Sequence, residues 1–315
     1  MVREIISKDD LTIVLPILNE KEGVGKVIEE LNGYGYKKIL VVDGYSSDGS
    51  REIAARNGAR VVEQVGKGKT GALLTAVKAV KTPYMLVMDG DFTYDPSCIK
   101  RMMAHASSYD EIIGARTDGR AHIPMVNRVG NHLLNWFFRA LFAVRLSDVC
   151  SGMYLLRTKA ARRLDFTTGG FDVEVEIVSQ FASEGRVAEV PVNYRPRLGV
   201  KKLSSFRHGL RIGTSIVRLA NAYNPVLLYS GIIAVAIIPS VAILAWAIYE
   251  RLFWNVLRTD YVLLAFMLFL IAAQALSVAT TSILIQRVER RLRATLSGET
   301  RRELSEPRTR RHPTP

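Results

Sequence analysis

Cysteine and histidine are scarce in this chain, which has two cysteines and five histidines among its 315 residues. Cys98 and Cys150 have no partner at zinc-ligand spacing, and two cysteines are too few for a disulfide framework. No two histidines stand at the H-x-x-x-H spacing that binds a metal from one helix face. The sequence therefore excludes a small disulfide-stapled protein, and its cysteine usage suits a reducing compartment.

Acidic residues are outnumbered, since 43 lysines and arginines against 30 aspartates and glutamates leave a net charge of +13. An excess of this size indicates an anionic partner, either nucleic acid or an anionic membrane surface. We find no internal repeat, and the one compositionally biased segment is the basic tail, residues 287–315. The 48% hydrophobic content is sufficient for a sizeable α/β core with an appendage.

Charge is missing altogether from two stretches near the C-terminus, residues 226–249 and 261–285. Each stretch is longer than the ~20 apolar residues that span a bilayer. The sequence therefore predicts two transmembrane helices within residues 225–286. They favour a membrane over nucleic acid as the anionic partner, and we expect no nucleic-acid binding.

The flanks of this hairpin predict its orientation. The first ten residues lack the apolar segment of a signal peptide. The arginine-rich tail indicates a cytoplasmic C-terminus by the positive-inside rule. We therefore expect an integral membrane protein whose N-terminal domain, residues 1–203, and both termini lie on the cytoplasmic side.

Residues 11–115 alternate short β-type runs with helix-like segments. This alternation predicts an α/β fold with a mostly parallel sheet covered by helices on both faces. Ligands of such sheets bind beyond the carboxyl ends of the strands, so the loops that follow the strands are where a site is expected. The expected strands are Leu11–Leu15, Lys38–Asp43, Ala59–Glu63, Tyr84–Asp89 and Glu111–Ala115.

Two segments, Arg128–Leu146 and Ser205–Tyr223, concentrate large apolar residues between arginines. This pattern predicts amphipathic helices that lie in the headgroup region of a membrane, the second within residues 204–224. The alternative is that both helices pack on the sheet. The predicted spans nearby favour the interfacial interpretation.

The strongest local motif is Asp89-Gly90-Asp91, at the end of a hydrophobic run. Two carboxylates separated by one small residue can hold a hard divalent cation, which in turn neutralises a diphosphate. Taken alone, the pattern also fits a turn with Asx-type hydrogen bonds. Three further strand-end loops support the metal interpretation, namely Pro16–Glu20, Asp43–Ser50 and Gly66–Lys69.

In this order and spacing, the four loops resemble those of family 2 glycosyltransferases of the GT-A fold, in particular the dolichyl-phosphate mannose synthase and polyprenyl-phosphate glucosyltransferase branch. The resemblance runs from residue 11 to residue 203 and continues into the two-span anchor. It implies a GT-A (Rossmann-like) catalytic domain with a divalent metal, Mn²⁺ or Mg²⁺, on Asp89 and Asp91. It also implies a nucleotide site made of Pro16, Leu18, Glu20, Asp43, Asp89, Gly90 and Arg197.

The second half of the domain adds matches that the family associates with phosphate groups. Residues 114–116 (GAR) resemble a G-x-R element, Arg128 resembles the arginine that opens an interfacial helix, and residues 148–153 (DVCSGM) resemble D-x-x-S-G-[FM]. Residues 189–191 (EVP), followed by Arg197 and Lys202, resemble the segment that closes over the diphosphate. The resemblance implies catalytic roles for Asp91, Arg116, Arg128 and Lys202, with Arg116, Arg128 and Ser151 at the acceptor phosphate.

Three departures from the family pattern concern the donor side. Gly44 stands where a second aspartate is usual, Thr93 where the mannose synthases often have glutamine, and Lys201 where serine is usual. These changes leave the family assignment intact and put the donor sugar in doubt.

The implied activity is inverting transfer of a hexose, with mannose favoured, from a nucleotide sugar to dolichyl or polyprenyl phosphate. GDP-mannose is the favoured donor, with UDP-glucose or UDP-N-acetylglucosamine as alternatives, and extension of a lipid-linked oligosaccharide as another. A processive polysaccharide synthase is disfavoured because the chain has no Q-x-x-R-W element and only two expected spans. A non-enzymatic basic module would leave the ordered carboxylates unexplained, and homo-oligomerisation is left open.

Overall fold

The computed structural model describes residues 6–118, 125–166, 173–184, 186–199 and 205–305. The chain divides into two compact units, Met1–Tyr223 and Asn224–Pro315. We call them the N-terminal unit and the hairpin unit and describe each by itself.

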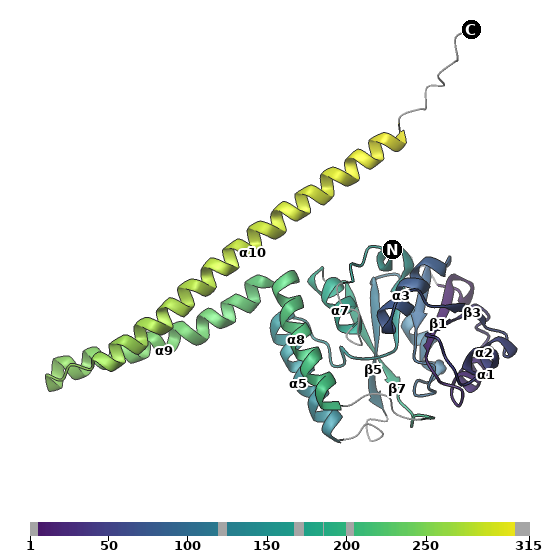
Figure 1. Cartoon of the computed structure of the whole chain (residues 1–315), viewed down its shortest axis with the longest axis horizontal. Helices are drawn as coiled ribbons and strands as arrows, with labels where there is room; N and C mark the ends of the chain where they lie inside the picture. Colours follow the sequence, from purple (N-terminus) through teal and green to yellow (C-terminus); the bar gives the residue numbers. More distant parts are fainter. Residues whose placement is uncertain (1–5, 119–124, 167–172, 185, 200–204, 306–315) are drawn as a thin grey trace, which may run out of the picture. The chain divides into compact units, whose positions relative to one another are not determined.

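A seven-stranded sheet forms the centre of the N-terminal unit, in the order β3-β2-β1-β4-β6-β5-β7 (Figure 1). All neighbouring strands are parallel except at β6, which is antiparallel to both β4 and β5. This confirms the predicted mostly parallel sheet. The strands are β1 (Leu11–Ile17), β2 (Ile39–Asp43), β3 (Arg60–Glu63), β4 (Tyr84–Val87), β5 (Glu111–Asp118), β6 (Tyr154–Arg157) and β7 (Val187–Asn193).

Helices cover both faces of this sheet because its central strands are apolar on both sides. Strand β1, for example, buries Ile13 and Leu15 in one core and Val14 in the other. The first core is completed by α1 (Val24–Gly33), α2 (Ser50–Arg56), 3-10 helix η2 (Pro96–Cys98) and α4 (Ile99–Met103). The second is completed by α3 (Gly68–Ala79), α6 (Thr158–Ala161) and α7 (Val173–Ser183).

The parallel register brings the loops that follow β1, β2 and β4 to one edge of the sheet. Ile17 pairs with Asp43 at the ends of β1 and β2, and β4 ends beside β1, where Val87 pairs with Val14. The first five strands were predicted from their apolar runs. Strands β6 and β7 were not, because both lie beyond residue 115, where the recognised alternation of strands and helices ended.

The two predicted amphipathic segments form α5 (Met125–Phe142) and α8 (Ser205–Tyr223), which lie side by side in the N-terminal unit (Figure 1). Helix α8 also contacts α7. Helix α5 buries Phe138, Leu141 and Phe142 and exposes another stripe at helical spacing. The stripe consists of Met125, Val129, Leu133 and Trp136. Helix α5 therefore packs within the unit on one face and presents large apolar side chains on another.

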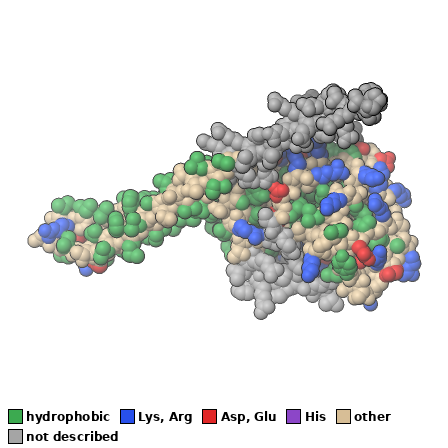
Figure 2. Space-filling model, turned by 45° about the horizontal axis from the view of Figure 1, so that its top comes forward, with side chains coloured by type: hydrophobic (Ala, Val, Ile, Leu, Met, Phe, Trp, Pro, Cys, Tyr) green, Lys and Arg blue, Asp and Glu red, His purple; other side chains and the backbone are tan. Residues whose placement is uncertain are grey.

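The hairpin unit consists of α9 (Pro225–Trp254) and α10 (Thr259–Ser305). Both helices are long and apolar enough to cross a membrane, and only 17% and 22% of their most apolar windows are buried. Small residues lie between them, and Ser240 donates a hydrogen bond to the Ala265 carbonyl at 2.7 Å. Hydrophobic side chains cover the outer surface of the paired helices (Figure 2). This surface is typical of helices that face lipid rather than of a soluble core.

Candidate functional site

A cavity of about 1010 Å³ opens at the carboxyl edge of the sheet. It is large enough for a nucleotide sugar or a ligand of similar size. Its walls come from the loops after β1, β2, β3 and β4, the start of α3, and side chains of α7 and α8. The side chains that carry chemistry on these walls are Glu20, Lys67, Lys69, Asp89, Asp91, Arg116, Cys150, Glu174 and Arg197.

Asp91 is a buried carboxylate with ordered partners on both of its oxygens. Oδ1 accepts hydrogen bonds from the Thr93 backbone N–H at 3.2 Å and from the Thr93 hydroxyl at 2.5 Å. Oδ2 lies 3.2 Å from a guanidinium nitrogen of Arg197. Burial, and then the charge of Asp89, raise the pKa of Asp91 above its usual value. Gly23 makes room for this loop, because a Cβ there would lie 2.7 Å from the Gly90 carbonyl.

Asp89 is held by a lysine that it shares with a second carboxylate. The Lys69 ammonium lies 2.7 Å from Asp89 Oδ1 and 2.5 Å from Glu174 Oε1. Burial lowers the pKa of Lys69, but the two carboxylates outweigh it and raise the pKa well above its usual range. On its other side the Asp89 carboxylate fits against Gly152, where a Cβ would lie 2.1 Å from Oδ2. Any side chain at position 152 would therefore displace Asp89.

Arg197 forms a second bridge between two carboxylates of the cavity. Besides Asp91, its guanidinium contacts Glu20 Oε1 at 2.6 Å. Arg197 comes from the segment after β7, whereas Glu20 comes from the loop after β1. The ion pairs therefore join the first and last strands of the unit at the cavity.

Arg116 lines the cavity but is held firmly by Asp148. Its Nε and one terminal nitrogen each lie 2.6 Å from an Asp148 oxygen, in a bidentate pair. Burial lowers the pKa of Arg116, but nearby Tyr94 and Asp148 outweigh this effect and raise it. Glu189 fixes the loop that carries Asp148, since its carboxylate accepts hydrogen bonds from the backbone and side chain of Ser147.

The cavity brings together eight of the residues expected from the sequence. They are Pro16, Leu18, Glu20, Asp89, Gly90, Asp91, Arg116 and Arg197. Three others are described but are not among its lining residues. Asp43 is buried beneath the β2 loop and accepts a hydrogen bond from the Ser46 backbone, Ser151 donates to the Gly114 carbonyl at 2.5 Å, and Arg128 is exposed on α5. Lys202 lies outside the described residues.

Comparison with known proteins identifies the family. Residues 12–164 match the glycosyl transferase family 2 domain. Glycosyltransferase AglJ of Haloferax volcanii is 33% identical over 231 residues, which cover 71% of this chain and 76% of the relative. The chain belongs to glycosyl transferase family 2.

Two further similarities bear on this glycosyltransferase. The dolichyl-phosphate hexose transferase of H. volcanii is 33% identical over 218 residues, covering 67% of this chain and 94% of the relative. The crystal structure of mannosyl-3-phosphoglycerate synthase from Rubrobacter xylanophilus superposes with a TM-score of 0.54 at 22% identity, covering 66% of this chain and 72% of that one. The structural likeness shows the fold, so the predicted GT-A fold and glycosyltransferase class are confirmed.

The glycosyltransferase site also contains residues to which the sequence analysis assigned no role. Lys69 was noted only as part of a glycine-containing loop, and Glu174 was not a candidate at all. Tyr45 and Gln64 line the cavity as well. The signal for Lys69 was its place in a strand-end loop, whereas Glu174 reaches the site from helix α7, far along the chain from the strand-end loops.

The carboxylates of the cavity fit a hard divalent cation. Glu20, Asp89, Asp91 and Glu174 line the cavity, and among the described residues Lys69 and Arg197 form ion pairs with them. Within the described residues no three acidic, histidine or cysteine side chains form a complete metal cage. Two carboxylates completed by substrate phosphates and water are the usual arrangement for Mg²⁺ beside a nucleotide.

Proposed function

We propose that this glycosyltransferase transfers a hexose, with mannose favoured, from a nucleotide sugar to dolichyl phosphate or a related polyprenyl phosphate. The observation that carries the proposal is the cavity in which Asp89 and Asp91 face Lys69 and Arg197. This charge pattern suits a divalent cation together with a diphosphate. The relative named dolichyl-phosphate hexose transferase, which the alignment covers over 94% of its length, supports the acceptor class.

Structural neighbours support the donor class. Glucosyl-3-phosphoglycerate synthase from Mycobacterium tuberculosis, in complex with Mn²⁺, UDP-glucose and phosphoglyceric acid, has a TM-score of 0.54 at 21% identity. We assign Mn²⁺ or Mg²⁺ to Asp89 and Asp91 of this chain, where a bound cation would neutralise the charge that develops on the departing diphosphate. Pro16, Leu18 and Glu20, which line the cavity, belong to the nucleotide side.

The reaction needs little acid–base chemistry from the protein. The second pKa of a phosphate monoester is about 6, so the lipid phosphate is largely dianionic near neutral pH. One of its oxygens forms a bond with the anomeric carbon while the bond to the nucleoside diphosphate breaks, and the diphosphate leaves with the electron pair. Attack from the opposite face inverts the anomeric centre. The protein's task is to position both phosphates and balance their charge.

Arginine side chains suit that task because a guanidinium binds phosphate through two parallel hydrogen bonds. We assign Arg197 to the leaving diphosphate, and Arg116 and Arg128 to the lipid phosphate. Arg116 is already oriented at the cavity by Asp148. Arg128 lies on α5, whose exposed stripe of Met125, Val129, Leu133 and Trp136 suits a membrane interface. The family resemblance implies a catalytic role for Lys202 beside the diphosphate, a place for Ser151 at the acceptor phosphate and one for Asp43 at the nucleotide.

The hairpin unit would hold the enzyme in the membrane that contains its lipid acceptor. Helices α9 and α10 would span the bilayer, with the catalytic domain and both termini on the cytoplasmic side. Cytoplasmic nucleotide sugars and a lipid phosphate in the same leaflet would then both reach the enzyme.

A donor panel tests the proposal directly. The full chain, purified in detergent, is incubated with dolichyl phosphate, Mn²⁺ or Mg²⁺ and labelled GDP-mannose, UDP-glucose or UDP-N-acetylglucosamine. We expect transfer to lipid from one of these donors, foremost GDP-mannose. Absence of transfer from all three would refute the proposed activity, and transfer from a UDP-sugar would replace the mannose assignment.

A further inference from the structure

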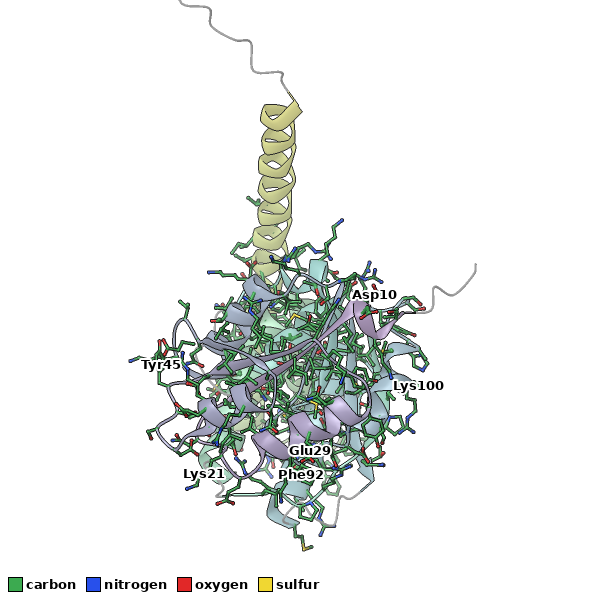
Figure 3. The ribbon with its side chains drawn as sticks, turned by 90° about the vertical axis from the view of Figure 1, so that its right-hand side faces the viewer. Asp10, Lys21, Glu29, Tyr45, Phe92 and Lys100 are labelled. Carbon is green, nitrogen blue, oxygen red and sulfur yellow. The ribbon has the colours of Figure 1, made fainter. Side chains whose placement is uncertain are left out.

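Tyr45 has a strained backbone and an exposed ring, and the proposed roles described above do not use it. Its φ is +68°, a left-handed conformation that is unfavourable for a bulky side chain. Its side chain is 62% exposed, yet it lines the cavity. Figure 3 shows Tyr45 on a loop at the edge of the N-terminal unit. Strain of this kind persists where the surrounding structure enforces it, and it clusters at ligand sites.

Phe92 provides an internal comparison, because it has the same backbone conformation with φ +71°. Its ring packs against the first core and lies beneath the Arg195 guanidinium, 5.0 Å from ring centroid to Cζ. Packing therefore explains why an aromatic side chain occupies that position. Tyr45 belongs to neither described core. Core packing does not account for its ring.

The Tyr45 ring is nevertheless held in place. Its hydroxyl donates to the Gln64 backbone carbonyl at 2.9 Å, so the ring bridges from the loop after β2 to the end of β3. The Leu18 side chain, 44% exposed, lines the same cavity from the loop after β1. Together Tyr45 and Leu18 provide flat and apolar surface in a cavity whose other described side chains include four acids, two lysines and two arginines.

We propose that the nucleobase of the donor stacks on the Tyr45 ring. The inference rests on the proposed function and refines its donor site. Of the parts of a nucleotide sugar, only the base has an aromatic face, whereas the diphosphate and sugar are polar and match the charged groups around Asp89. Base stacking on an aromatic ring is tolerant of the identity of the base. The ring therefore selects nucleoside diphosphates over inorganic diphosphate.

Replacement by glycine separates binding from folding. Tyr45→Gly removes the ring and relieves the left-handed backbone, which glycine adopts freely. We expect its thermal unfolding midpoint to equal or exceed that of the native protein, while GDP and UDP bind about 10-fold more weakly, the usual effect of losing one stacking ring. Tyr45→Phe keeps the ring and should bind within about 3-fold of the native protein. The matched control is Tyr34→Ala, an exposed tyrosine at the end of α1 that does not line the cavity.

The measurement is calorimetric titration of the detergent-solubilised full chain with GDP, UDP and inorganic pyrophosphate in the presence of Mg²⁺. A loss for both nucleotides in Tyr45→Gly, with pyrophosphate unchanged, supports stacking. Native affinity for the nucleotides, or an equal loss for pyrophosphate, would overturn the inference while leaving the proposed transferase activity intact. Failure of the native chain to bind either nucleotide would overturn both. If Tyr45→Gly does not fold, Tyr45→Leu provides the same comparison without the flat ring.

Discussion

The two edges of the sheet both bury a carboxylate among basic side chains, but they differ in what surrounds it. At the amino edge Asp110 is fully buried and forms ion pairs with Arg157, Arg163 and Arg186. At the carboxyl edge Asp89 and Asp91 pair with Lys69 and Arg197, and all four residues line the cavity. The arginines therefore enclose Asp110, whereas Asp89 and Asp91 border a cavity that a ligand can enter.

The groups around each carboxylate suit it to a different role. Three arginines around Asp110 leave positive charge in excess, and their side chains are 33% to 65% exposed, so water solvates the surplus. At the carboxyl edge the side chains of Lys69 and Glu174 are only 14% and 11% exposed, and both line the cavity. Carboxylates that border a cavity can bind a divalent cation, whereas a carboxylate enclosed by arginines cannot. Stability should therefore depend on Asp110 and catalysis on Asp91.

The largest expected effect is on turnover at the carboxyl edge. Asp91→Asn should lower transferase activity by roughly 1,000-fold, the upper range for removing one preorganised charge-stabilising group. Its unfolding midpoint should not fall, because burial already disfavours the charged carboxylate. Activity with labelled donor and thermal unfolding in detergent measure the two effects. Asp95→Asn, four residues later and outside the cavity lining, is the control that should remain active. Asp91→Asn activity within 10-fold of native would contradict the assignment.

At the amino edge we expect a loss of stability without a loss of nucleotide binding. Asp110→Ala should lower the free energy of unfolding by about 3 kcal/mol, since it leaves three arginines without their buried partner. Nucleotide affinity should not change at a temperature where the variant is folded. Denaturant unfolding monitored by tryptophan fluorescence and titration with GDP provide the two values. Glu29→Gln, an exposed carboxylate on α1 labelled in Figure 3, is the control. A loss of nucleotide affinity without a loss of stability would contradict the structural role of Asp110.

The lysine shared by Asp89 and Glu174 is expected to have an intermediate effect. Lys69→Met leaves two carboxylates facing each other without a cation and should lower the free energy of unfolding by about 2 kcal/mol. Adding Glu174→Gln should recover about 1 kcal/mol of this loss, which a double-mutant cycle measures as coupling. Lys67→Met, two residues earlier with an exposed side chain, is the matched control. Strict additivity of the two substitutions would rule out the shared ion pair.

Sequence patterns predicted the parts of this site that depend on local chemistry. The apolar runs that became β1, β2 and β4 located the edge of the sheet, and the D-x-D motif located two of its carboxylates. The pairing of Lys69 with Glu174 depends on α3 and α7 packing on the same face of the sheet, over about a hundred residues of chain. No pattern within a short stretch of sequence predicts that these two side chains meet.

Ser151 is a residue that a sequence motif selected but that does not line the cavity. The D-x-x-S-G-[FM] motif selected this residue, but only 2% of its surface is exposed. Its hydroxyl donates a hydrogen bond to the Gly114 carbonyl. A motif records which residue types recur near a site. It does not tell which of them face the ligand and which hold the loop beneath it, because that depends on how β5 and β6 pair.

The smallest expected effect is the pH dependence of the Asp48 turn, which supports the carboxyl edge from outside the cavity. Asp48 accepts hydrogen bonds from the Ser50 hydroxyl at 2.5 Å and from the backbone of Ser50 and Lys21 at 3.0 and 3.1 Å. Burial raises the pKa of Asp48, but these hydrogen bonds outweigh it and lower the pKa below its usual value. The carboxylate therefore stabilises the fold above about pH 4, and this contribution disappears as the pH falls through the lowered pKa.

Comparison with Asp48→Asn isolates that contribution. The native chain should have the higher unfolding midpoint at pH 6, and the difference should shrink steadily between pH values of about 4 and 2 as Asp48 becomes protonated in the native protein. Asp9→Asn, at an exposed position in the first 3-10 turn, controls for the general loss of stability in acid. A difference that stays constant over this range would mean that the Asp48 turn depends on the shape of the side chain rather than on its charge. The carboxyl edge would then depend on electrostatics only where it borders the cavity.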